Sequence, residues 1–156
     1  MKKRTSINKH VKQKELISYE MFYFGQNILW GFAALLVTYL TDIGISAISA
    51  SAIILIPKLW DAFNDIIFGY IVDRHKFKNG QKFIPWIRIG VSTVGIATIL
   101  LFAIPSNVEN TTKIIWFIIA YLLFDTSYTV LDTTSFSLVT VMTNDVDERT
   151  SIIGGV

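Results

Sequence analysis

The amino-acid sequence predicts an all-α membrane protein with four transmembrane helices, and three observations support this prediction. First, 52% of the 156 residues are hydrophobic and 17% are charged, with a mean hydropathy of +0.50, whereas a soluble domain usually carries about 25% charged residues. Second, four long apolar stretches occupy approximately residues 19–40, 47–72, 84–104 and 114–142. Third, Lys and Arg are concentrated in alternate connections between these stretches.

The lengths of the four stretches favour membrane-spanning helices. Each meets or exceeds the roughly 20 residues that an α-helix needs to cross a ~30 Å hydrocarbon core, and backbone in lipid must satisfy its own hydrogen bonds. The first stretch holds Glu20 as its only charge, and the third holds only Arg88. A cleaved signal peptide is the alternative for the first stretch, because a basic leader precedes it. Its apolar region is longer than the roughly 7–15 residues of a signal core and three more stretches follow, so we expect a retained helix.

The distribution of Lys and Arg predicts the orientation of the helices. Residues 1–18 carry six of the fourteen Lys and Arg residues and residues 73–83 carry four, whereas residues 41–46 and 105–112 carry none. We therefore expect the N-terminus, the 73–83 loop and residues 143–156 to lie in the cytoplasm, with the helices in the plasma membrane. The final "SIIGGV" is expected to start a fifth helix that is cut short, as in a fragment or a truncated gene product.

The second stretch contains "IPKLWDAFNDIIFG", which places three charges inside an apolar helix. Asp61 and Asp65 are four residues apart and share one helix face, and Lys58 joins that face. A charge in mid-bilayer costs about 2.5–3.5 kcal/mol or more, so these residues are expected to face a bundle interior or an aqueous cavity. Carboxylate oxygens are hard ligands that suit Na⁺ or the exchange of a proton. A structural ion cluster that only joins helices is the alternative.

The fourth stretch carries a polar stripe, and the first carries two amides. Asp125, Thr129, Asp132, Thr133 and Phe136 recur at helical spacing, and such a lining suits a polyhydroxylated ligand or a path for a hydrated cation. In the first stretch Gln26 and Asn27 stand near Tyr23 and Trp30. The amides either bond between helices or contact a ligand on which the aromatic rings stack.

Several function classes are excluded or disfavoured. The chain has no cysteine, so it has no disulfide and no thiolate site. We find no nucleophile–base pair and no metal-ligand cluster typical of an enzyme, and His10 and His75 fall in predicted loops. The basic leader is most simply an orientation determinant, so no nucleic-acid partner and no cofactor are expected.

Four segments resemble one transporter family. They are "YFGQNILWGFAALLVTYLTDIGIS", "KLWDAFNDIIFGYIVDR", "GQKFIPWIRIG" and "LDTTSFSLVTVMTNDVDERTSI". Together they resemble the glycoside–pentoside–hexuronide:cation symporters of the major facilitator superfamily, the family of the melibiose permease. The resemblance covers nearly the whole chain and implies the N-terminal part of a twelve-helix fold built from two six-helix halves.

The resemblance also implies functional residues, which we carry over position by position. Asp61 and Asp65 match the carboxylates that bind the coupling cation, which is Na⁺, Li⁺ or H⁺ in the family, and Asn64 and Thr129 match their neighbours. Lys58 matches a basic position that could act as a charge partner. The residues implied in solute binding are Asn27, Tyr128, Asp132 and Phe136. The residues implied in cytoplasmic gating are Gly69, Asp73, Arg74 and Arg149.

Two positions depart from the melibiose-transporter pattern. Asn27 stands where that pattern has a carboxylate, and Phe136 stands where it has a tryptophan. An amide can pair with a sugar hydroxyl but cannot accept with a full charge, so galactoside specificity does not follow. The sequence therefore predicts Na⁺- or H⁺-coupled symport of a glycoside or related sugar, with the bilayer, the sugar and the cation as partners. We expect a chain of four spans to be inactive alone; a non-transporting remnant or structural helix bundle is the alternative.

Overall fold

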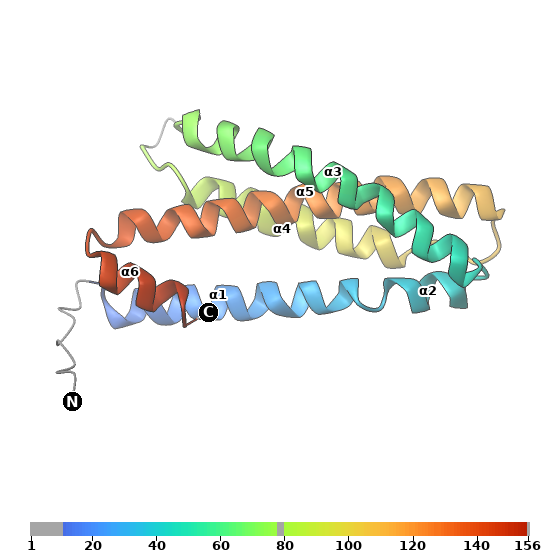
Figure 1. Ribbon diagram of the computed structural model, residues 1–156, viewed down its shortest axis with the longest axis horizontal. Coiled ribbons are helices and arrows are strands. Elements are labelled where there is room, and N and C mark those ends of the chain that lie inside the picture. The colour runs from blue at the N-terminus through green and yellow to red at the C-terminus, as the bar shows by residue number, and fades with distance from the viewer. Residues whose placement is uncertain (1–10, 78–79, 156) are drawn as a thin grey trace. The chain divides into compact units, whose positions relative to one another are not determined.

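A computed structural model describes residues 11–77 and 80–155, and within these ranges all regular structure is helical. Six helices follow one another along the chain (Figure 1). They are α1 (Gln13–Ala33), α2 (Leu36–Asp42), α3 (Ala47–Arg74), α4 (Ile84–Phe102), α5 (Asn110–Met142) and α6 (Val146–Ile153). Most of the basic leader, including His10, and also Lys78 of the 73–83 loop lie outside the described residues.

The described chain forms two compact units, which we treat separately. One unit comprises the described parts of Met1–Ala33 and Phe136–Val156, and the other comprises Ala34–Ser135. The long helix α5 contributes to both, because the division falls after Ser135. The residues expected to bind a cation all belong to the second unit.

The first predicted span, 19–40, falls on two helices instead of one. Helix α1 ends at Ala33 and α2 begins at Leu36. Helix α1 also begins at Gln13, six residues before the apolar stretch, with the carbonyl of Lys12 accepting from the N–H groups of Glu15 and Leu16. Lys, Gln and Glu are good helix formers, so hydropathy alone does not locate this boundary.

The number of spans is supported in part. Among the described residues, α4 and α5 are long and apolar enough to cross a membrane, and α1 with α2 makes a third if these two helices form one span. Helix α3 is 28 residues long, which exceeds the length of a span. It is not among the described helices that are apolar enough to cross a membrane, because Lys58, Asp61 and Asp65 lower its hydropathy. Its crossing of the membrane therefore stays a prediction.

The C-terminal region contains a short capped helix. The side chain of Asp145 accepts hydrogen bonds from the N–H groups of Asp147 (2.8 Å) and Glu148 (3.1 Å), which begins α6 at Val146. This is the N-cap arrangement in which a carboxylate satisfies free helix donors. A helix was expected to begin only at "SIIGGV", but α6 already begins at Val146.

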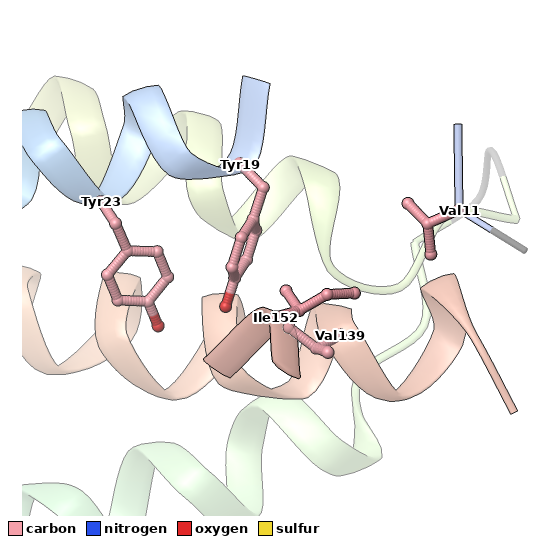
Figure 2. Close-up of a cluster of buried hydrophobic side chains, with 5 residues drawn as sticks. All are labelled: Val11, Tyr19, Tyr23, Val139 and Ile152. Carbon is pink, nitrogen blue, oxygen red and sulfur yellow. The ribbon is translucent and has the colours of Figure 1, made fainter. Parts of the chain in front are cut away.

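In the first unit a small apolar core joins α1, the end of α5 and α6. Figure 2 shows its buried members, Val11, Tyr19, Tyr23, Val139 and Ile152. The rings of Tyr19 and Tyr23 lie 4.9 Å apart. The N–H of Val11 also donates to a carboxylate oxygen of the buried Glu148 at 3.2 Å. The residues just before α1 are therefore held against α6.

In the second unit α4 and α5 pack closely at Gly90. A Cβ atom at this position would lie 2.7 Å from the side chain of Leu131, so only glycine fits without movement of a neighbour. Side chains of α2 and α5 also reach the ends of nearby helices. The Nζ of Lys113 donates to the carbonyl of Ile43 at 2.6 Å, and the N–H of Ile104 donates to the hydroxyl of Tyr39 at 3.2 Å.

Candidate cation site between α3 and α5

One face of α3 packs against α5 through two polar contacts. The indole nitrogen of Trp60 donates to the hydroxyl of Thr126 at 3.2 Å. One turn later the Nδ2 of Asn64 donates to the hydroxyl of Thr129 at 3.1 Å. Asn64 is completely buried, and residues four apart on a helix share a face. The structure therefore brings together Asn64 and Thr129, two residues that the sequence pointed to as neighbours of a cation.

The charged residues of α3 lie on a different face of the same helix. Asp61 directly follows Trp60, and Asp65 directly follows Asn64. One step along an α-helix rotates the side-chain direction by about 100°. Both carboxylates and Lys58 are exposed on the described chain. Within 11–77 and 80–155 no ion pair joins Lys58 to either carboxylate, so its role as charge partner stays a prediction. Both carboxylates nevertheless lie one helical step from the buried contact of Asn64 and Thr129.

Asp125 of α5 lies on the helix that packs against α3 here; the sequence analysis placed it in the polar stripe of the fourth stretch, without an individual role. Its side chain is half-buried, and its Oδ2 atom is buried without a hydrogen-bond partner among the described residues. It stands four residues before Thr129, on the same helix face, as the helical spacing of the stripe predicted. Across the described residues no three Asp, Glu, His or Cys side chains come close enough to hold a metal ion by themselves. Neutral oxygens would have to complete any cation site here.

The residues expected to bind solute fall in both units. In the second unit Asp132 and Tyr128 are half-buried on α5, and the Tyr128 ring stacks near Phe124 with centroids 6.1 Å apart. In the first unit the Nδ2 of Asn27 donates to the carbonyl of Tyr23 at 3.0 Å, and Phe136 meets the Tyr23 ring edge-on at 5.8 Å. Asn27 also lines an open pocket of about 440 Å³ on α1, together with Glu20, Tyr23 and Phe24.

The residues expected to act in gating make local contacts. Asp73 pairs with Lys82 at 3.2 Å across the α3–α4 connection, and the guanidinium of Arg74 lies 4.4 Å from the centre of the Tyr70 ring. A Cβ at Gly69 would meet nothing within 4 Å. Arg149 donates from Nε to the carbonyl of Thr143 (2.8 Å) and from a terminal nitrogen to that of Thr140 (3.2 Å). It thereby caps the C-terminal end of α5.

Long apolar helices with a polar cluster between two of them define a class of protein, the helical membrane protein with an internal polar site. The family follows from comparison with known proteins. Residues 19–154 match the pattern of the family described as MFS/sugar transport protein, and the chain belongs to this family. Its members are transport proteins and not enzymes, as expected from the sequence.

Similar proteins carry names of the same kind. An uncharacterized symporter of Bacillus subtilis, YjmB, is 34% identical over 147 residues, which cover 92% of this chain and 32% of the relative. A glucuronide carrier protein homolog of Escherichia coli is 26% identical, and the match covers 92% of this chain and 32% of the relative. The putative glycoside/cation symporter YagG of Escherichia coli is 30% identical, and the match covers 87% of this chain and 30% of the relative. The chain thus spans about a third of the length of these relatives.

Proposed function

We propose that this chain forms part of a secondary transporter that couples the entry of a glycoside or related sugar to the entry of Na⁺ or H⁺. The contact between Asn64 and Thr129 carries this proposal. It is a buried polar bridge between two apolar helices, one helical step from the paired carboxylates Asp61 and Asp65. Ionisable groups inside membranes are expensive, and they commonly mark ion and substrate pathways.

The solute is proposed from chemistry and from the names of relatives. One relative is named a glucuronide carrier homolog and another a putative glycoside/cation symporter. On this chain Asp132 and Tyr128 offer a carboxylate and a phenol on the second unit, and Asn27 offers an amide on the first. Hydroxyl-rich solutes are recognised by such polar groups together with aromatic faces. Phe136, beside Tyr23, supplies an apolar ring for a sugar face.

We further propose that the helices span a plasma membrane with the N-terminus in the cytoplasm. The Lys and Arg distribution supports this orientation. Because the chain spans about a third of its relatives, we expect it to need further helices for transport and to be inactive alone. Gly69, Asp73, Arg74 and Arg149 are then expected to control closure at the cytoplasmic side.

Uptake by the complete protein tests the proposal. Cells that express it should accumulate a labelled glycoside or glucuronide, with uptake stimulated by an inward Na⁺ or H⁺ gradient. Asp61→Asn and Asp65→Asn should each reduce gradient-driven uptake by about tenfold or more, because each removes a charged cation ligand. Asp42→Asn, the same change at an exposed residue at the end of α2, is the matched control.

Two outcomes would contradict the proposal. Gradient-driven uptake that is unchanged in both α3 variants would remove Asp61 and Asp65 from the cation site. A complete protein that is present in the membrane but accumulates none of these solutes would favour the alternative, a helix bundle that does not transport them.

A further inference from the structure

Helix α4 carries a single charged residue, Arg88, and this residue lies on an exposed face of the helix. Helix α4 is one of the described helices that are long and apolar enough to cross a membrane. The residues that share the face of Arg88 by helical spacing are also exposed; they are Ile84, Ser92 and Ile99. Arg88 therefore places one positive charge on an otherwise uncharged face of a candidate span.

The guanidinium of Arg88 has no hydrogen bond or ion pair with any residue in 11–77 or 80–155. Only the backbone carbonyl of Arg88 is engaged, and it accepts from the hydroxyl of Ser92 at 3.0 Å. The neighbouring sequence offers no carboxylate, because no Asp or Glu occurs between Arg74 and Val108. Asp73, just before this interval, pairs with Lys82 at 3.2 Å. An anionic partner for Arg88 must therefore come from outside this part of the chain.

The position of Arg88 along α4 places its charge near the end of the span. Arg88 is the fifth residue of the helix, so its Cα lies about 6 Å along the axis from that of Ile84. Side chains of a helix lean toward its N-terminus, and a long arginine side chain can extend along apolar surface to keep its charge at a polar boundary. The first turn of a helix also carries a partial positive charge that favours anions. The guanidinium can thus reach the level of the lipid headgroups.

We propose that Arg88 binds the phosphate of an anionic phospholipid whose acyl chains lie along the exposed apolar side chains of α4. A planar guanidinium can donate to two phosphate oxygens at once. The preceding residues 73–83 contain four Lys and Arg residues and one Asp, and such an excess of positive charge attracts anionic headgroups. In the proposed orientation this lipid belongs to the cytoplasmic leaflet. The inference goes beyond the proposed transport, because it needs neither the solute nor the coupling cation.

Lipid binding to the purified complete protein, measured by native mass spectrometry, tests this inference. The delipidated protein in detergent is titrated with dioleoylphosphatidylglycerol and, for comparison, with zwitterionic dioleoylphosphatidylcholine. The unsubstituted protein should bind phosphatidylglycerol more tightly, and Arg88→Gln should weaken that binding by about fivefold, because one basic contact is lost. Lys14→Gln removes the same charge at an exposed residue at the start of α1. This control should leave the affinity within about twofold.

A second variant separates the geometry of the contact from its charge. Arg88→Lys keeps the positive charge but lacks the planar fork, so its affinity for phosphatidylglycerol should lie between those of the unsubstituted protein and Arg88→Gln. Equal affinity in the unsubstituted protein and Arg88→Gln overturns the inference, and so does an equal loss in Lys14→Gln. No preference for phosphatidylglycerol over phosphatidylcholine in the unsubstituted protein overturns it as well.

A carboxylate elsewhere in the complete protein is the alternative partner of Arg88. In that case Arg88→Gln should lower the thermal unfolding temperature and leave the binding of phosphatidylglycerol unchanged, and this result also overturns the inference. The binding measurement contains no solute and no cation gradient. A failure of lipid binding is therefore distinct from a failure of the proposed function, which gradient-driven uptake tests separately.

Discussion

The side chains of Asn64 and Thr129 meet at 3.1 Å, although 65 positions separate them in the sequence. This hydrogen bond and that from Trp60 to Thr126 one turn earlier set how α3 lies against α5. Because Asn64 is completely buried, its amide has no access to water. The contact therefore contributes to the stability of the second unit as well as to the candidate site.

Removal of the acceptor should destabilise this interface. Thr129→Val keeps the shape of the side chain and deletes its hydroxyl, which leaves the Asn64 amide with one partner fewer in a buried place. We expect a loss of about 1–3 kcal/mol in the free energy of unfolding, seen as a lower thermal unfolding temperature in detergent. Thr98→Val is the control, because the Thr98 hydroxyl donates to the carbonyl of Val94 in its own helix at 2.7 Å. An equal loss in both variants would show that the contact between helices adds nothing.

The site was only partly predictable from the sequence, and the reason is helix register. The spacing of Asp61 and Asp65 places them on one face of one helix, which needs no tertiary information. The pairing of Asn64 with Thr129 came from resemblance to a family, not from spacing. The contact of Trp60 with Thr126 depends on how far α3 is shifted and rotated against α5, and the periodicity of a single helix does not contain that information.

The same limit applies to the fold. Long apolar runs located α3, α4 and α5 to within a few residues, because burial in lipid demands continuous hydrophobic length. Hydropathy does not locate the start of α1 at Gln13 or the break between α1 and α2 before Leu36. The close approach at Gly90 is likewise a property of two packed helices and not of one sequence window.

Gly90→Ala should weaken the packing of α4 against α5. The new Cβ would lie 2.7 Å from the Cγ and Cδ2 atoms of Leu131, whose side chain is 1% exposed and has little room to move. We expect a loss of about 1–3 kcal/mol from overpacking, measured by thermal unfolding in detergent.

Gly95→Ala is the matched control for this substitution. It lies on the same helix, and a Cβ there would meet nothing within 4 Å. The control should be neutral or stabilising by up to about 1 kcal/mol, since alanine is the better helix former. The variants Gly90→Ala, Leu131→Ala and the double variant should also show non-additive losses. Additive losses would contradict a direct clash.

Lys113 should hold the connection between α2 and α3 in place. Lys113 is 5% exposed, and its ammonium donates to the carbonyl of Ile43 at 2.6 Å, just after the end of α2. A cation at a helix C-terminus interacts favourably with the helix dipole and with free carbonyls. In Lys113→Met the apolar stem remains and the donor is lost, so backbone amides of residues 40–46 should exchange hydrogen about tenfold faster. The exposed Lys14 offers Lys14→Met as control, and unchanged exchange in Lys113→Met would show that the contact is not needed.

Arg149 should stabilise the end of α5 through its forked geometry. Its Nε and one terminal nitrogen donate to the carbonyls of Thr143 and Thr140 at 2.8 and 3.2 Å. A lysine at this position keeps the charge but lacks the planar fork, so Arg149→Lys should retain part of the stabilisation and Arg149→Met none of it. With each hydrogen bond worth about 1 kcal/mol, the thermal unfolding temperature should fall in the order arginine, lysine, methionine. If Arg149→Met unfolds at the same temperature as the unsubstituted protein, the cap does not stabilise α5, and a contribution of Arg149 to cytoplasmic closure would have to come from contacts elsewhere.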